Sequence, residues 1–268
     1  MDTECRICFG KTSIFDKAQI LNKYMVTYYY CPHCGFIQTE EPFWLNESYS
    51  RAIAKSDTGI MSRNLSNVSN LLFFLKNIPQ KAACLDFGGG HGILTRIMRD
   101  YGFEFYHYDK YAENLFAAGF EGDVNGNKSY KVVTSFENFE HFVKPLEEIE
   151  KLLSISELLY FTTLLLPSTP FLIRDWWYYA PENGQHISFY SKKTLQYLAQ
   201  KYNMFFLSNN KDTHILSKNK INKHFFKFFT VYKKINKITV SSFLKRKSKT
   251  WDDMNTILFE LKNEKREI

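Results

Sequence analysis

The pattern of hydrophobic and polar positions predicts alternating helices and strands through the middle of the chain. Apolar residues at helical spacing over 65–75 predict a helix that ends before Pro79. A short apolar run over 82–85 predicts a buried strand, and after a run of glycines the helical spacing resumes over 93–98. A second apolar stretch over 103–109 predicts another strand. This order of elements indicates a doubly wound α/β sheet.

The same alternation continues toward the C-terminus. Apolar runs bounded by turn residues predict strands, and helical spacing predicts the segments between them. These elements are a helix over 147–153, a buried strand over 158–166, a helix over 194–201 opened by Ser191, and a hairpin over 204–217. The hairpin is the antiparallel ending that closes many such sheets.

The glycine turn is the stretch most informative about function. Gly88, Gly90 and Gly92 allow a ligand to approach the backbone closely, and the following helix offers unpaired N–H groups. The spacing fits neither the dinucleotide fingerprint nor a phosphate-binding P-loop. Asp86 precedes the glycines, and Asp109 ends the next predicted strand 23 residues later. An acid at that point can accept hydrogen bonds from a ribose hydroxyl pair.

Asp86-x-Gly-x-Gly-x-Gly followed by Asp109 resembles motif I and the second-strand acid of class I S-adenosylmethionine (SAM)-dependent methyltransferases. The resemblance implies a Rossmann-like, seven-stranded doubly wound α/β sheet. It also implies that SAM binds along the turn with its ribose on Asp109. Further contacts to SAM implied by the resemblance are Tyr49 and Arg63, before the first strand, and Phe136, near the fourth. A simple surface lid over 49–63 is the alternative.

Four cysteines form two C-x-x-C pairs separated by 22 residues. Cys5, Cys8, Cys31 and Cys34 can surround one tetrahedral zinc ion, because each pair is pre-bent for two ligands. A site closed by four thiolates predicts a structural Zn²⁺ rather than a catalytic one.

The segment after the predicted buried strand combines aromatic and polar residues. Trp176, Trp177, Tyr178 and Tyr179 are expected to wall the substrate site, because aromatic rings stack well on sugars or bases. His186 follows them and is the candidate general base, since an imidazole titrates near neutrality. The side chains expected to orient or assist it are Glu182 and the Glu140-His141 pair, which matches a Glu-His pair found after the fourth strand in the methyltransferase family.

The combination of a four-cysteine module, a SAM domain and the His186 segment resembles methyltransferases of bacterial sugar-nucleotide and surface-polysaccharide (capsule, O-antigen) biosynthesis. The acceptor implied is a small polar molecule, phosphorylated or nucleotide-linked. The chain departs from the sugar C-methyltransferases in having only about 50 residues after the hairpin, so O-methylation is also open. The expected units are a zinc-binding module over 1–45, a helical lid or linker over 46–80, a SAM domain over 81–217 and a basic, mainly helical segment over 218–268.

Charge and hydropathy bear on the expected binding partners and cellular location of the protein. The chain has a net charge of +7, and 11 Lys and Arg with no acidic residue lie between Lys218 and Lys249, so the remainder is mildly acidic. The basic segment could favour phosphorylated substrates or weak contact with an anionic membrane surface. No apolar stretch long enough to span a membrane and no signal sequence is evident, so we expect a cytoplasmic protein.

Two other function classes stay open. A zinc-containing ribosomal-RNA base methyltransferase would suit the basic segment, although the chain lacks an Asn/Asp-Pro-Pro-Tyr/Phe motif and nucleic acid is not the expected partner. A non-catalytic interaction protein with a SAM-type fold is the second alternative.

Overall fold

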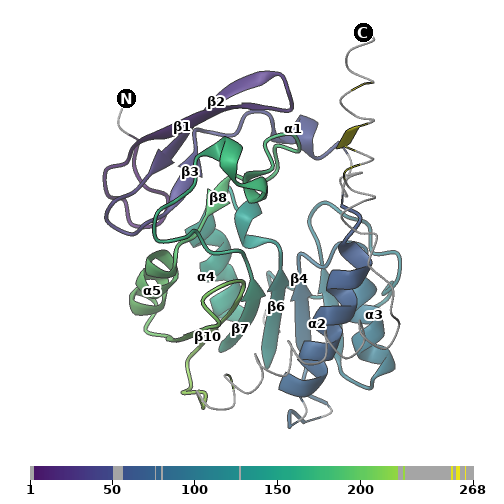
Figure 1. The fold of residues 1–268 in the computed structure, drawn as a ribbon. Coiled ribbons are helices and arrows are strands. Elements are labelled where there is room, and N and C mark those ends of the chain that lie inside the picture. The colour runs from purple at the N-terminus through teal and green to yellow at the C-terminus, as the bar shows by residue number, and fades with distance from the viewer. Residues whose placement is uncertain are drawn as a thin grey trace, which may run out of the picture.

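A computed structural model describes residues 3–50, 57–75, 77–79, 81–126 and 128–222, with a few single positions beyond. Its central sheet has the strand order β5-β4-β6-β7-β10-β9 (Figure 1). Four strands are parallel, namely β4 (Cys84–Phe87), β5 (Phe105–Tyr108), β6 (Val132–Phe136) and β7 (Leu158–Thr162). The hairpin of β9 (Phe205–Ser208) and β10 (Thr213–Ser217) adds two antiparallel strands beside β7.

Helices cover both faces of this sheet, as the alternation along its central strands requires. Val132 packs with α2 (Ile60–Phe74) and α3 (Ile93–Asp100), whereas Val133 packs with α4 (Pro145–Ile155) and α5 (Lys192–Lys201). Figure 1 shows these two helix pairs on opposite sides of the strands. Burial on both faces explains why neighbouring residues are both apolar at the start of β4, in Cys84-Leu85, and of β6, in Val132-Val133.

The described sheet has six strands, not the seven implied by the family resemblance. Beyond β5 the chain makes a single parallel bridge, between His107 and Glu121. The segment between β5 and β6 instead bonds to its own side chains. For example, the Asp123 carboxylate accepts the N–H groups of Asn125 and Gly126 at 3.0 and 2.7 Å. Such local side-chain bonds favour turns over a strand ladder.

A second, antiparallel sheet contains the N-terminal strands β1 (Ser13–Ile20), β2 (Tyr24–Tyr30) and β3 (Ile37–Thr39). Its fourth strand, β8 (Ser188–Phe189), comes from far along the chain and pairs with β3. The residue before β8, Ile187, donates its N–H to Glu140 in η1 (Phe139–His141), which follows β6. The N-terminal sheet therefore adjoins the carboxyl edge of the central sheet, where open α/β sheets bind ligands.

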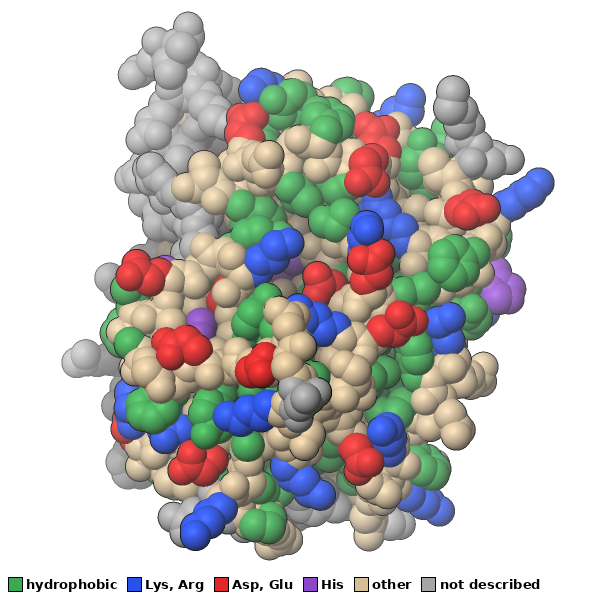
Figure 2. Space-filling view, turned by 180° about the vertical axis from the view of Figure 1, so that it is seen from behind, with side chains coloured by type: hydrophobic (Ala, Val, Ile, Leu, Met, Phe, Trp, Pro, Cys, Tyr) green, Lys and Arg blue, Asp and Glu red, His purple; other side chains and the backbone are tan. Residues whose placement is uncertain are grey.

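Three short helices complete the described fold. They are α1 (Leu45–Ser48), η2 (Ile173–Asp175) and η3 (Trp177–Tyr179). Most of the predicted basic segment over 218–268 lies outside the described residues. None of the described helices has the length and hydrophobicity needed to cross a bilayer. On the face shown in Figure 2, acidic and basic side chains are interspersed.

Candidate active site

The glycine turn after β4 forms an open shelf at the carboxyl edge of the sheet. Its backbone is held from below, because Gly88 N–H donates to the carbonyl of Tyr108 at 2.8 Å and His107 Nε2–H donates to the carbonyl of Gly90 at 2.8 Å. Gly90 has a φ of +57°, and a Cβ added there would meet no atom within 4 Å. At Gly88 an added Cβ would collide with Asn138. The open space therefore lies over Gly90.

The Asp109 carboxylate accepts three backbone hydrogen bonds, one of them from the glycine turn. Its Oδ2 accepts from Gly90 N–H at 2.8 Å, and its Oδ1 accepts from the N–H groups of Tyr111 and Ala112 at 2.7 and 2.8 Å. A carboxylate offers about four acceptor positions. Asp109 thus supports the shelf over which the cofactor was predicted to bind, and it retains acceptor capacity on Oδ2 for a ribose hydroxyl.

Asp86 lies beneath the turn and is 2% exposed. Thr134 Oγ1 donates to its Oδ1 at 2.9 Å. Burial raises the pKa of Asp86 to about 7, although the hydrogen bond from Thr134 opposes this shift. An added Cβ at Gly89 would lie 2.6 Å from Asp86 Oδ2, so this carboxyl group packs directly against the turn. Asp86 therefore supports the glycine turn from beneath.

Tyr49 contacts Tyr111, which follows Asp109, on one side and His141 on the other. Its ring stacks on Tyr111 with centroids 4.5 Å apart and planes 7° from parallel. Its hydroxyl lies 3.1 Å from Nδ1 of His141, which also lies 3.1 Å from the carbonyl oxygen of Gln185. Since a carbonyl can only accept, His141 carries its proton on Nδ1 when it bonds Gln185. Tyr49 was predicted to contact the cofactor, and Tyr111 was not foreseen.

Glu140, His141 and His186 converge into one cluster. A donor atom from each of the three side chains lies within 4.8 Å of the donor atoms of the other two. The two imidazole rings meet edge to face at 4.9 Å. Nδ1 of His186 lies 2.6 Å from the carbonyl oxygen of Tyr178, so that nitrogen carries the proton and Nε2 keeps its lone pair. This combination of groups can remove a proton or bind a cation.

The cluster is electrostatically unusual because it is buried. Burial raises the pKa of Glu140 to about 7, while the neighbouring hydroxyls of Tyr178 and Thr163 lower it in part. Within the described part of the chain, neither oxygen of Glu140 has a hydrogen-bond partner of good geometry. Burial lowers the pKa of His141 to about 3, and also lowers the pKa of His186. Both imidazoles are therefore neutral near pH 7.

Glu137 adds a second buried carboxyl group to this region. Burial and the nearby charge of Glu140 raise its pKa to about 7. Its φ of +51° is rare for a side chain of this kind. The Arg63 charge favours the ionised forms of Glu137 and Glu140, but the guanidinium itself pairs with Asp57, with Nη2 at 2.7 and 2.6 Å from the two carboxylate oxygens.

The predicted aromatic wall divides into two parts. Tyr178 and Tyr179 are buried in the core beneath the N-terminal sheet, with relative exposures of 1% and 0%. Tyr178 also bonds Thr163, with the two hydroxyl oxygens 3.1 Å apart. Trp177 is 62% exposed, and Trp176 is half-buried against Tyr179. Packing thus accounts for the two tyrosines, while the two tryptophans remain candidates for substrate contact.

Two other predicted site residues lie apart from the cluster. Phe136 is half-buried and packs edge to face on Tyr160, at 5.5 Å between centroids, in the core between the sheet and α2. Glu182 contributes no donor atom to the cluster of Glu140, His141 and His186 among the described residues. Its charge raises the pKa of His186, although burial has the larger, opposite effect.

The four cysteines meet as their spacing predicts. The Sγ atoms of Cys5 and Cys34 are 3.5 Å apart, those of Cys8 and Cys31 are 3.4 Å apart, and all four lie within 4.8 Å of one another. Metal–sulfur bonds of about 2.3 Å in a tetrahedron place sulfurs roughly 3.8 Å apart. The four side chains therefore fit a tetrahedral metal ion with little movement.

The cysteine cluster is built into the rest of the fold. Thr194 Oγ1, in the first turn of α5, donates to the carbonyl of Cys34 at 2.9 Å, and Lys193 Nζ donates to the carbonyl of Pro32 at 3.2 Å. Cys5, Cys31 and Cys34 are fully buried in the same core as α4 and α5. Loss of a metal here would loosen the start of α5 as well as the N-terminal sheet.

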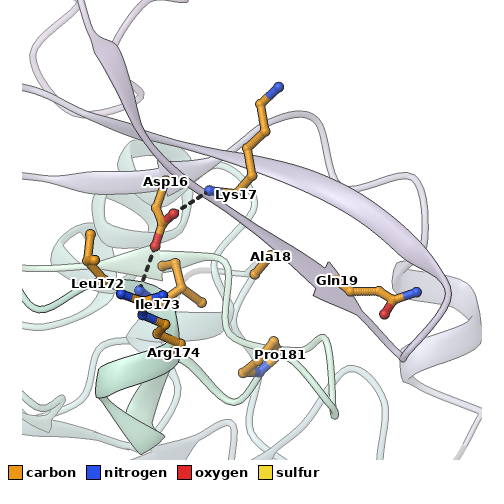
Figure 3. Close-up of a pocket in the computed structure, with 8 residues that line it drawn as sticks. All are labelled: Asp16, Lys17, Ala18, Gln19, Leu172, Ile173, Arg174 and Pro181. Atoms are coloured by element: carbon orange, nitrogen blue, oxygen red, sulfur yellow. Dashed lines mark hydrogen bonds between the residues drawn. The ribbon is translucent and has the colours of Figure 1, made fainter.

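A cavity of about 390 Å³ lies elsewhere, between β1 and η2 (Figure 3). Its lining comes from Asp16 to Gln19 of β1, from Leu172 to Arg174 and from Pro181, and includes none of the clustered histidines. The Asp16 carboxylate accepts the N–H groups of Lys17 and Ile173, each at 2.8 Å. This carboxylate ties η2 to the N-terminal sheet.

A family model described as a methyltransferase domain matches residues 60–206, which is more than half of the chain. The chain belongs to this methyltransferase family. The match begins with α2 and ends within β9, so it includes the glycine turn, the Glu140–His141–His186 cluster and the aromatic segment. A search of curated proteins finds no match.

Several solved methyltransferase structures are similar to this chain at low identity. CalO1, a methyltransferase in calicheamicin biosynthesis with SAH bound, is 13% identical, with a TM-score of 0.41 over 59% of this chain and 55% of CalO1. The plantazolicin methyltransferase BpumL with SAH is 15% identical, with a TM-score of 0.47 over 66% and 93%. Magnesium protoporphyrin IX methyltransferase from Synechocystis PCC 6803 is 16% identical, with a TM-score of 0.43 over 64% and 90%. The chain thus spans just over half the length of CalO1.

Several residues of the site were not evident from the sequence. Tyr111 follows Asp109 by two positions, and that spacing could have suggested it as a wall of the cofactor site. Glu137 lies three residues before Glu140 and Gln185 directly precedes His186, whereas Thr163 follows β7 and joins the cluster only through folding.

Proposed function

We propose that the protein is a SAM-dependent methyltransferase that methylates an oxygen of a small polar acceptor. The observation that carries this proposal is the open shelf over Gly90 beside Asp109, in a chain of the methyltransferase family. Gly88, Gly90 and Gly92 would lie along the methionine part of SAM, and Asp109 Oδ2 would accept a ribose hydroxyl. Tyr111 and Tyr49 would border the same space. When bound, SAM supplies a methyl group on a positively charged sulfur.

His186 is proposed as the general base. Its Nδ1–H is held by the carbonyl of Tyr178, which leaves Nε2 free to take a proton from the acceptor hydroxyl. Glu140 would stabilise the imidazolium that forms, and His141 would hold the ring edge to face. Because methyl transfer needs the acceptor oxygen in line with the bond that breaks, much of the rate would come from positioning the two bound molecules.

The acceptor is proposed to be a sugar nucleotide or another phosphorylated metabolite, as in bacterial surface-polysaccharide biosynthesis. The exposed Trp177 and the half-buried Trp176 support a sugar or base acceptor, since indole rings stack on such groups. The basic segment after residue 217 would meet a phosphate on the substrate, and most of its structure lies outside the described residues. A small metabolite of this kind would place the enzyme in the cytoplasm.

The cysteine cluster is proposed to bind one structural Zn²⁺ ion. Four sulfurs leave no open position for a substrate, and three of the cysteines are buried in the core. Cys31→Ser should lower the melting temperature and the yield of soluble protein, because folding of such sites is coupled to the metal. Metal analysis of protein purified without chelators should give one zinc per chain, and protein free of zinc would contradict the proposal.

Calorimetry with SAH, followed by a screen with radiolabelled SAM, tests the function. We expect SAH to bind the full chain, and label to pass to one class among nucleotide sugars, phosphorylated metabolites and ribosomal RNA. Transfer to RNA would overturn the small-molecule acceptor, and a salt-sensitive gel shift would support that outcome. Absence of SAH binding by folded, zinc-loaded protein would overturn the enzymatic function and favour a non-catalytic interaction protein.

A further inference from the structure

We propose that Glu140, His141 and His186 form a second metal site, which binds one divalent transition-metal ion. The three side chains supply two imidazoles and one carboxylate whose donor atoms lie within 4.8 Å of one another. This site is separate from the four cysteines and rests on its own donor geometry rather than on the proposed reaction. It gives the cluster a ligand that the methyltransferase function does not require.

The histidines are oriented as metal-binding histidines usually are. Nδ1 of His186 donates to the carbonyl of Tyr178 at 2.6 Å, and Nδ1 of His141 donates to the carbonyl of Gln185 at 3.1 Å. A backbone carbonyl on one ring nitrogen fixes the ring and its tautomer, and leaves the other nitrogen as a neutral donor. In these tautomers Nε2 of each ring carries the lone pair, and the ring of His141 also contacts the backbone of Glu137.

Glu140 provides the independent reason to expect a cation. Its side chain is completely buried, and within the described residues neither carboxylate oxygen has a hydrogen-bond partner of good geometry. An ionised carboxylate in such a buried place is costly unless it is compensated, and the hydroxyls of Tyr178 and Thr163 compensate that of Glu140 only in part. Glu137 adds a second acidic group nearby, whereas the guanidinium of Arg63, whose charge acts on both acids, is paired with Asp57. A divalent cation would balance both acids.

The donor set selects the class of metal. Imidazole nitrogens with a single carboxylate favour Mn²⁺, Fe²⁺, Co²⁺, Ni²⁺ or Zn²⁺ over Mg²⁺ and Ca²⁺, which prefer oxygen ligands. Metal–ligand bonds near 2.1 Å need donor atoms roughly 3–4 Å apart, so the cluster would contract slightly on binding. Three protein ligands leave positions open for water or for an oxygen of the acceptor.

The metal and the proposed base compete for the same lone pair. An ion held by Nε2 of His186 prevents that nitrogen from taking a proton, so we expect added Co²⁺ to inhibit methyl transfer. This expectation rests on the proposed function, whereas binding of the ion does not. Direct binding and activity are therefore measured separately.

Titration of the zinc-loaded full chain with Co²⁺, followed by visible absorption, tests the site. We expect one Co²⁺ per chain with weak d–d bands and without the strong near-ultraviolet absorption of cobalt–thiolate bonds. Glu140→Gln and His141→Asn should each weaken binding at least tenfold. His91→Asn is the matched control, because His91 lies outside the cluster with Nδ1 bonded to the carbonyl of Glu113; its affinity for Co²⁺ should be unchanged.

Three outcomes separate the site from the reaction. Absence of stoichiometric Co²⁺ binding by the wild-type protein would overturn the metal site, and this measurement requires no variant to fold. Equal affinity in folded Glu140→Gln would also overturn it, by placing the ion elsewhere. Activation by Co²⁺ would support the metal site and overturn the role of His186 as base.

Discussion

Nδ1 of His186 and the carbonyl oxygen of Tyr178 are 2.6 Å apart, and this contact fixes which nitrogen of the imidazole is basic. A carbonyl oxygen cannot donate, so the proton lies on Nδ1 and Nε2 stays unprotonated in the neutral ring. The backbone of η3 thus determines the chemistry of a side chain eight residues later. The aromatic segment serves the site by placing this carbonyl, in addition to any contact it makes with substrate.

His186→Ala should reduce turnover by a factor of roughly 10²–10⁴, because general-base catalysis typically accelerates a reaction by this factor. The affinity for SAH should be unchanged. His186→Asn should be nearly as slow, since it keeps a hydrogen-bonding group but cannot take a proton. Steady-state kinetics on the acceptor found by screening, with calorimetry for SAH, check both variants. Parental turnover in both would show that His186 only packs and that positioning alone drives catalysis.

Burial lowers the pKa of His186 below its ordinary value, so the ring stays neutral as the pH falls to its usual pKa. In the wild type, measured with metal chelated from the open cluster, protonation of His186 should therefore not lower the rate until the pH is below 6.5, whereas protonation of Glu140, whose pKa burial raises to about 7, should lower it from near pH 7.

Tyr49→Phe should lower turnover without weakening SAH binding. The substitution removes the hydroxyl 3.1 Å from Nδ1 of His141 but keeps the ring that stacks on Tyr111. Loss of one hydrogen bond is worth about 1 kcal/mol, which corresponds to a few-fold lower turnover. Tyr49→Leu also removes the stack and should weaken SAH binding in addition. If Tyr49→Phe weakened SAH binding at unchanged turnover, the hydroxyl would contact the cofactor and not the histidine.

Local sequence signals predicted much of the fold. The helix opened by Ser191 is present, because Ser191 and Thr194 form a reciprocal capping box at the start of α5. The apolar run over 158–166 yields a shorter strand than expected. After Thr162 the backbone leaves the ladder, and Thr163 N–H bonds the carbonyl of Asp212 in the loop before β10. Apolar composition alone does not show where a ladder ends.

The convergence of the site could not be predicted locally. Glu140 and His186 are 46 positions apart in the chain and meet because Ile187 bonds the carbonyl of Glu140 and continues into β8. A two-residue strand such as β8 has no sequence pattern of its own. Tyr178 likewise resembled a substrate contact, since nothing in the sequence indicates that it packs under the N-terminal sheet.

Gly90→Ala should abolish most SAH binding and only slightly lower stability. The added Cβ would enter space that holds no protein atom within 4 Å, so the folded protein tolerates it apart from the cost of a φ of +57°. That cost is about 1–2 kcal/mol for a residue with a Cβ. Calorimetry with SAH and thermal melting measure the two effects.

Gly119→Ala is the matched control for this substitution. Gly119 has a φ of +87° and equally open surroundings, but it lies outside the glycine turn. It should show a similar loss of stability with normal SAH affinity. Normal affinity in Gly90→Ala as well would show that the cofactor does not approach this shelf, and the proposed binding mode would be wrong.

Asp86→Asn should remove a pH-dependent loss of stability. Burial raises the folded-state pKa of Asp86 from 3.8 to about 7. Between these values the folded protein holds a proton that the unfolded chain has released, so the free energy of unfolding falls as the pH rises through this window. At about 1.4 kcal/mol per unit, the shift from 3.8 to about 7 should cost the wild type on the order of 4 kcal/mol from this group by pH 8. Asparagine keeps an acceptor for Thr134 and does not titrate.

Melting temperatures of the zinc-loaded wild type and Asp86→Asn between pH 5.5 and 8.5 should therefore diverge, with the wild type falling relative to Asp86→Asn. Parallel curves for the two proteins would show that Asp86 is ionised throughout this range, with a solvated path or cation beside it that supports its charge.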